Sequence, residues 1–203
     1  MNKSYITVFL GVLLWSGIYP KDYLTWFMET LPAILGFITL LITKKQFPLT
    51  PLLYNLILLH CIILMIGGHY TYAEVPLFEW LKENHVFERN NYDKIGHFAQ
   101  GFIPAIISRE IIIRLELLKR KHWLNFFTIC ICLALSAFYE LIEWWVALLL
   151  GQNAEAFLGT QGYIWDTQSD MGYALFGTLS ALFSLSNYHN KEILNLTTKN
   201  QNN

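Results

Sequence analysis

The sequence Asn90-Asn91-Tyr92-Asp93-Lys94-Ile95-Gly96-His97-Phe98-Ala99-Gln100-Gly101 opens an apolar segment that continues to about Ile113. If this segment is a helix, its polar and small residues recur with the i, i+4, i+7, i+8 spacing of one helical face. These residues are Asp93, His97, Gln100, Gly101, Pro104 and Ser108. Because lipid cannot solvate a polar stripe, the stripe must face other helices or a wet cavity. The stretch therefore predicts a bundle that packs around it.

The composition places the chain among membrane proteins. Hydrophobic residues make up 54% of its 203 residues and charged residues only 14%, against about 25% charged in a soluble domain. The formal net charge is −1, and no basic face with interleaved aromatic residues is present. The sequence therefore predicts a chain whose partner is the lipid bilayer and which does not bind nucleic acid. Protein partners cannot be inferred from it.

Six apolar segments are long enough, or nearly so, to cross a membrane, which takes roughly 20 residues. They cover about residues 5–19, 24–43, 52–70, 92–113, 123–149 and 164–187. We expect an all-α polytopic bundle with a single integral membrane domain over residues 1–190. The short first span could instead be a signal peptide, although no clean cleavage site follows it. Residues 76–82 suit a short interfacial helix, and the polar tail 191–203 is expected to be cytoplasmic and disordered.

The distribution of lysine and arginine predicts the orientation of the bundle, because cytoplasmic loops carry the excess of these residues. With the N-terminus inside, nine basic residues lie on the inner side and four on the outer side. The inner set is Lys3, Lys44, Lys45, Arg114, Lys119, Arg120, Lys121, Lys191 and Lys199. Both termini are therefore expected in the cytoplasm.

Acidic residues concentrate toward the opposite, outer side of this map. At 1.5 Å per residue, Glu140 lies about 25 Å from the inner start of its span, and His97 and Asp170 lie about one turn into theirs from outside. We expect these groups to line an outward-facing polar pocket, with Asp93 orienting His97. The candidate catalytic residues are His97, Asp93, Glu140, Glu143, Asp166 and Asp170.

The same side chains have the donor atoms for a metal or for acid–base chemistry. Together with His69, which follows Gly67-Gly68 at the end of the third span, they suggest a divalent metal as cofactor. The candidate ligands are His69, His97, Glu140 and Asp170. The alternative is an interhelical hydrogen-bond network in which Arg89 and Lys94 pair with the acids.

Several long motifs resemble the YjdF family of uncharacterised bacterial inner-membrane proteins. They are residues 67–74 (GGHYTYAE), 89–98 (RNNYDKIGHF), 139–144 (YELIEW) and 159–171 (GTQGYIWDTQSDM). The resemblance implies a multi-pass helical protein of the bacterial inner membrane and no particular reaction. A more distant similarity is to VanZ-like membrane proteins, whose Asp-Lys-x-x-His-Phe opening matches Asp93 to Phe98, although Tyr173 and Ala174 follow Asp170 where those proteins carry an asparagine.

Three kinds of function are compatible with these features. The pocket could act on a lipid-linked or other envelope substrate, as an enzyme or a binding site. It could carry protons or cations in a small transporter, with Pro32, Gly36 and Pro104 as helix breaks. The chain could also be a structural partner protein without chemistry. The sequence does not decide whether it is an enzyme.

Overall fold

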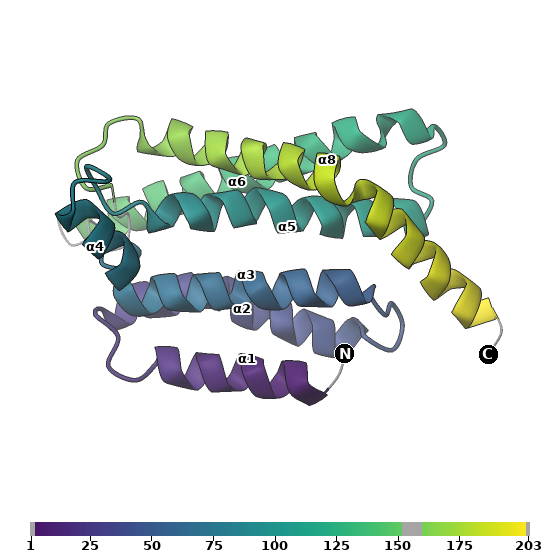
Figure 1. Ribbon diagram of the computed structural model, residues 1–203, viewed down its shortest axis with the longest axis horizontal. Helices are drawn as coiled ribbons and strands as arrows, with labels where there is room; N and C mark the ends of the chain where they lie inside the picture. Colours follow the sequence, from purple (N-terminus) through teal and green to yellow (C-terminus); the bar gives the residue numbers. More distant parts are fainter. Residues whose placement is uncertain (1–2, 152–159, 202–203) are drawn as a thin grey trace.

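The computed structural model describes residues 3–151 and 160–201, and these residues form an all-helical bundle (Figure 1). The apolar runs give long helices because each span satisfies its own backbone hydrogen bonds. In chain order the elements are α1 (Lys3–Ser16), α2 (Tyr23–Thr43), α3 (Pro51–Tyr70), α4 (Pro76–Glu83), α5 (Tyr92–Arg114), the short 3-10 helix η1 (Lys121–Trp123), α6 (Leu124–Leu150) and α8 (Asp166–Gln201).

The predicted all-α class is confirmed for the described residues. Three segments are long and apolar enough to cross a membrane by length and composition, namely Tyr23–Thr43, Pro51–Tyr70 and Lys121–Leu149. Helix α1 is apolar but has only 14 residues. Helices α5 and α8 match two further expected spans in position, and both carry charged residues.

The tail behaves differently from the prediction. Helix α8 continues through the polar segment to Gln201, so the expectation of disorder from residue 191 is wrong as far as residue 201. Each residue added to an existing helix gains a hydrogen bond without a new nucleation cost, and α8 is already nucleated in its apolar part. The final turns lean away from the bundle (Figure 1).

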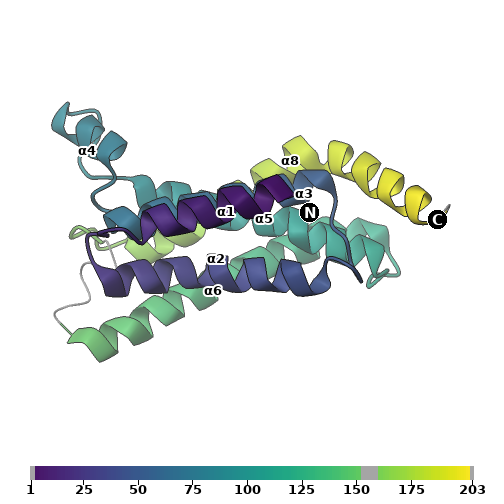
Figure 2. The ribbon, with the colours of Figure 1, turned by 90° about the horizontal axis from the view of Figure 1, so that it is seen from below.

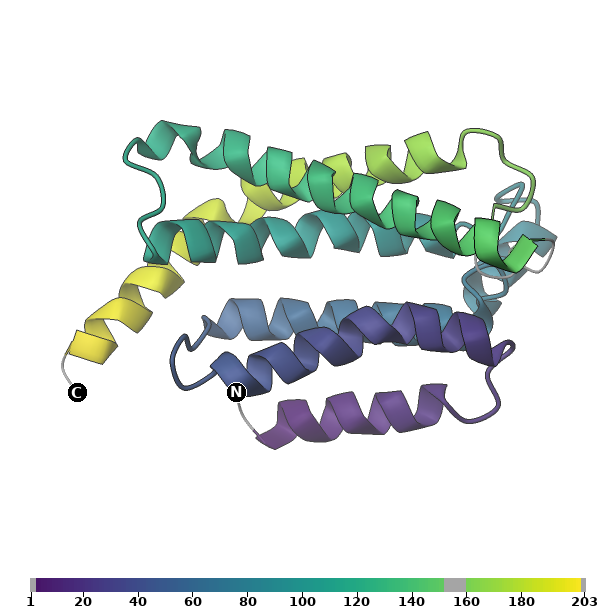
Figure 3. The ribbon, with the colours of Figure 1, turned by 180° about the vertical axis from the view of Figure 1, so that it is seen from behind.

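The helices form two groups of three. Helices α1, α2 and α3 pack together, as do α5, α6 and α8, and α3 joins the groups by packing against α5 (Figures 1 and 3). One apolar core lies within the first group, around Phe9, Ala33, Cys61 and Met65. A second core links α3 to the other group. It contains Leu53, Ala105, Ile106, Cys132 and Ala181.

Both termini lie at the same end of the bundle, opposite α4 (Figure 1). We call the two ends the terminal end and the α4 end. Figure 2 shows α4 standing away from the helices at its end. Residue Asn90, which is fully buried, holds this region together by donating to the carbonyl of Val75 at 3.1 Å and to Glu79 at 3.3 Å. Lys82 donates to Glu79 and thereby lowers the pKa of that carboxyl.

The closest helix contact joins α5 to α8. A Cβ atom added to Gly101 would overlap the backbone carbonyl of Ala174, and one added to Gly177 would overlap that of Phe98. Thr178 donates from its hydroxyl to the carbonyl oxygens of Gly101 at 3.2 Å and Ala174 at 2.9 Å. Small residues let membrane helices approach backbone to backbone in this way.

A buried polar cluster secures the terminal end of this helix pair. The carboxylate of Glu110, which is fully buried, accepts hydrogen bonds from Thr50 at 2.7 Å, Arg114 at 2.8 Å and His189 at 3.0 Å. The backbone N–H of Thr50 also donates to it, at 3.0 Å. The cluster therefore ties the start of α3 and the end of α5 to α8.

Candidate functional site

A lysine lies at the centre of the ionisable cluster at the α4 end. The Nζ atom of Lys94 lies 2.6 Å from Asp170 Oδ1, 3.0 Å from Asp166 Oδ1 and 3.3 Å from Asp93 Oδ2. Its side chain is 7% exposed, so the carboxylates, and not water, stabilise the charge of this ammonium. Lys94 and Asp93 begin α5, and the other two acids begin α8.

Arg89 is the second cation of the cluster. Its guanidinium donates to Asp93, four residues later, and at 2.9 Å to Asp166. It also donates to the backbone carbonyl of Thr160 at 3.0 Å. Two cations therefore neutralise part of the charge of the three aspartates, as the hydrogen-bond-network alternative anticipates.

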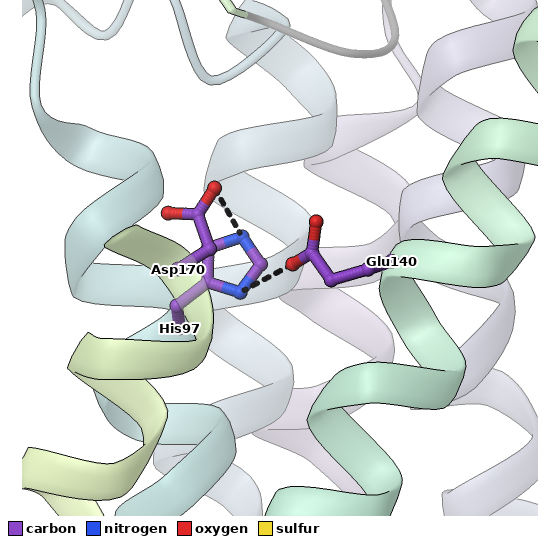
Figure 4. Close-up of side chains that lie close together, drawn as sticks. All are labelled: His97, Glu140 and Asp170. Atoms are coloured by element: carbon purple, nitrogen blue, oxygen red, sulfur yellow. Dashed lines mark ion pairs between the residues drawn. The ribbon is translucent and has the colours of Figure 1, made fainter. Parts of the chain in front are cut away.

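His97 lies one turn deeper, between two carboxylates from different helices (Figure 4). Its Nδ1 atom is 3.9 Å from Glu140 Oε1 on α6, and its Nε2 atom is 3.7 Å from Asp170 Oδ2 on α8. Both separations exceed a hydrogen bond. The contact of hydrogen-bond length is between Nδ1 and Gln100 Oε1, at 3.0 Å.

A cavity of about 250 Å³ adjoins this histidine. It lies between the two helix groups, because its walls come from α2, α3, α5, α6, α8 and Tyr72. Apolar side chains form much of the wall, and the polar side chains come mostly from α2, α5 and α6. The lining residues are Glu29, Pro32, His60, Leu64, Tyr72, Asp93, Gly96, His97, Gln100, Pro104, Leu135, Phe138, Tyr139, Ile142, Glu143 and Asp170.

The structure brings the six candidate catalytic residues to one region. Asp93, Asp166 and Asp170 surround Lys94, His97 lies between Glu140 and Asp170, and Glu143 lines the cavity. Asp93 does not take the expected role of orienting His97, because it pairs with Arg89 and Lys94. The side chain in hydrogen-bond contact with the imidazole is Gln100.

His69 is not brought to this region, although the sequence suggests it as a metal ligand. Its Nδ1 atom contacts the carbonyl oxygen of Ser16 at 2.9 Å, and its ring packs beside Trp15 with the centroids 4.7 Å apart. The last turn of α3 therefore directs His69 toward α1. Tyr72 fills the space beside Gly67 instead.

The cavity wall also includes an acid and a histidine that the predicted site lacks. Glu29 on α2 is 4% exposed and accepts a hydrogen bond from the Tyr139 hydroxyl at 3.1 Å. His60 on α3 lines the cavity, and its Nε2 atom is buried with no hydrogen-bond partner among the described residues. An acid and a histidine within otherwise apolar spans were the available signals, since such groups are functional candidates by default.

Comparison with known proteins assigns the family. The family model described as "Predicted membrane protein (DUF2238)" matches residues 1–191. The chain belongs to the DUF2238 family. One similar protein is "Inner membrane protein YjdF" of Escherichia coli strain K12, which is 49% identical over 193 residues, or 95% of this chain and 92% of the relative. No solved structure matches the chain.

The match to this relative confirms the resemblance to the YjdF family and, with the family model, places the chain in the inner membrane. Neither description states an activity, a substrate or a cofactor. The similarity to VanZ-like proteins stays a prediction. What the site does must therefore be argued from its geometry.

Proposed function

We propose that the chain crosses the inner membrane six times, with both termini in the cytoplasm. Two observations support an even number of crossings and this orientation. Both termini lie at the same end of the bundle (Figure 1). The loops that join α2 to α3 and α5 to α6, which carry Lys44, Lys45, Lys119 and Arg120, lie at that end as well, as the positive-inside rule requires.

Cysteine labelling in spheroplasts tests this topology. In a background with Cys61, Cys130 and Cys132 replaced by alanine, we expect Glu83→Cys, an exposed residue on α4, to react with a membrane-impermeant maleimide in spheroplasts. Lys119→Cys, an exposed residue on the basic loop, should react only after the membrane is permeabilised. The reverse labelling pattern would show that the proposed orientation is inverted.

We further propose that the cavity binds an amphiphilic envelope molecule, a lipid or lipid-linked precursor, from the side opposite the cytoplasm. The carrying observation is a cavity of about 250 Å³ with an apolar wall and a buried ionisable end. Leu64, Leu135, Phe138 and Ile142 suit a hydrocarbon chain. The volume is slightly below the roughly 300–1,000 Å³ of typical ligand pockets, which fits a headgroup and the first part of a chain.

The charges of the cavity favour one class of headgroup. Arg89 and Lys94 are already paired with aspartates, so neither cation is available to a phosphate. The remaining polar groups on the wall include Glu29, Glu143 and Gln100, which accept hydrogen bonds. A headgroup with hydroxyl or amine donors therefore matches the wall better than a bare anion does.

Filling the cavity tests its role in binding. In Ile142→Trp, the larger side chain should occupy the space and remove any co-purifying amphiphile, whereas the neighbouring Leu141→Trp should retain it, since Leu141 is 44% exposed on the outside of α6. Lipids extracted from protein purified in native nanodiscs would be compared by mass spectrometry with those of the bulk membrane. The proposal fails if the wild-type protein enriches no component over the bulk membrane, or if both variants retain the same one.

A further inference from the structure

We propose that His97, Glu140 and Asp170 form a binding site for a divalent transition-metal ion, with Zn²⁺ the best match. One ligand atom from each residue can be chosen so that all three lie within 4.8 Å of one another. The residues come from α5, α6 and α8, and each is at least nine-tenths buried. Catalytic zinc sites use three protein ligands of these types and leave a fourth position for water or substrate.

An unsatisfied carboxylate points into this site. The Oε1 atom of Glu140 is buried and has no hydrogen-bond partner within the described part of the chain, and the Glu140 residue is 7% exposed. Figure 4 shows this oxygen directed at the His97 ring, on the side away from Asp170. A buried acceptor left without a donor is unfavourable by about 1–3 kcal/mol, and a coordinated cation would satisfy it.

The separations inside the group suit an ion better than direct contact. His97 Nδ1 lies 3.9 Å from Glu140 Oε1, and the other ring nitrogen, Nε2, lies 3.7 Å from Asp170 Oδ2. Both distances are too long for hydrogen bonds. Ligand atoms around a tetrahedral Zn²⁺ are about 3.4 Å apart, given bonds of about 2.0–2.1 Å. An ion binds only one of the two nitrogens, so side-chain rotations must bring both carboxylates to that nitrogen from ligand-atom separations that are now within 4.8 Å.

In a neighbouring group of carboxylates, a lysine ammonium occupies the place that a metal ion would take. Asp93, Asp166 and Asp170 also bring oxygens within 4.8 Å of one another, but the Lys94 ammonium contacts all three. That group holds a built-in cation. The group around His97 shares Asp170 and has no lysine or arginine paired with Glu140 among the described residues.

The charge of the whole cluster favours a divalent ion. Four carboxylates face two cationic side chains, so two negative charges remain when all the acids are ionised and the imidazole is neutral. These residues are Asp93, Asp166, Asp170, Glu140, Arg89 and Lys94. Buried excess charge is costly unless it is neutralised by a proton or a cation, and histidine with carboxylates is a donor set for Zn²⁺.

Metal analysis of the purified full-length protein tests this assignment. Protein stripped with a chelator and incubated with Zn²⁺ should retain about one ion per chain after desalting, and its Tm should rise by about 5–10 °C when free Zn²⁺ is 100 times Kd. Glu140→Gln, which preserves shape, should weaken Zn²⁺ binding by at least about 100-fold, more than loss of an outer-shell partner does. His97→Ala should do the same.

The control is Glu116→Gln, an exposed acid just beyond α5 that lies outside the cavity lining and outside the three-residue group. It should bind Zn²⁺ like the wild type, and the metal-free Tm of all variants should stay near that of the stripped wild type. Absence of retained Zn²⁺ in the wild type, or equal loss of Zn²⁺ binding in Glu116→Gln, would overturn the assignment. This inference does not depend on the amphiphile: a wild-type protein that enriches a lipid but retains no Zn²⁺ would refute the metal site and leave the proposed amphiphile binding intact.

Discussion

Replacing Gly101 with alanine is expected to separate α5 from α8 and to remove most of the folded protein from the membrane. The added methyl group would overlap the backbone carbonyl of Ala174, so no side-chain rotation can relieve it. Overpacking inside a core typically costs about 1–3 kcal/mol, and a collision with backbone should reach or exceed the upper value. The measurement is the fraction of detergent-extracted protein that elutes as a monodisperse species during a thermal ramp.

Gly172→Ala provides the control for this substitution, because Gly172 lies on α8 and its Cβ would meet no atom within 4 Å. Alanine is favoured over glycine within a helix by about 0.8–1.0 kcal/mol, so this variant should be at least as stable as the wild type. Similar Tm values for Gly101→Ala and Gly172→Ala would show that the backbones of α5 and α8 do not approach closely at Gly101.

Glu110→Gln should give the second large loss of stability. The change keeps the shape of the side chain but removes the charge that accepts from Thr50, Arg114 and His189. It also puts an amide N–H₂ where only donors face it. Removing one partner of a buried ion pair costs about 3–5 kcal/mol because the other charge stays buried. We expect a markedly lower Tm, measured by the same thermal ramp.

Glu116→Gln removes the same charge from an exposed position just beyond α5. Its stability should stay within about 0.5 kcal/mol of the wild type, as for most surface substitutions. If Glu110→Gln were equally neutral, the terminal-end cluster would not contribute to the fold. Because Glu110 is remote from the cavity lining, any folded fraction of Glu110→Gln should keep its Zn²⁺ binding.

The positions of the helices follow closely from sequence patterns. The predicted spans 52–70 and 92–113 match α3 and α5 to within one residue at each end, because long apolar runs between polar loops leave few alternatives. The tail prediction failed for residues 191–201 because composition alone ignores the helix that precedes the tail. Local polarity is a weak guide where a long helix is already formed.

The sequence predicts the depth of the site residues in the membrane, but it does not predict which side chains form ion pairs. Counting residues along each helix is enough to place His97, Glu140 and Asp170 at one level. Which acid receives Lys94 depends on how α5 and α8 are rotated and how closely they approach, and Gly101 and Gly177 set that approach. The direction of His69 likewise depends on contacts with another helix, because it faces Trp15 and the carbonyl oxygen of Ser16 on α1.

Helices α5 and α8 are fastened to each other at three levels. Lys94 with the aspartates joins them at the α4 end, the glycine contacts join them at mid-length, and Glu110 with His189 joins them at the terminal end. The two helices should therefore move together as one rigid body. Since the other walls of the cavity come from α2, α3 and α6, any widening of that cavity would have to come from movement of α6 or of the α1–α3 group relative to this pair.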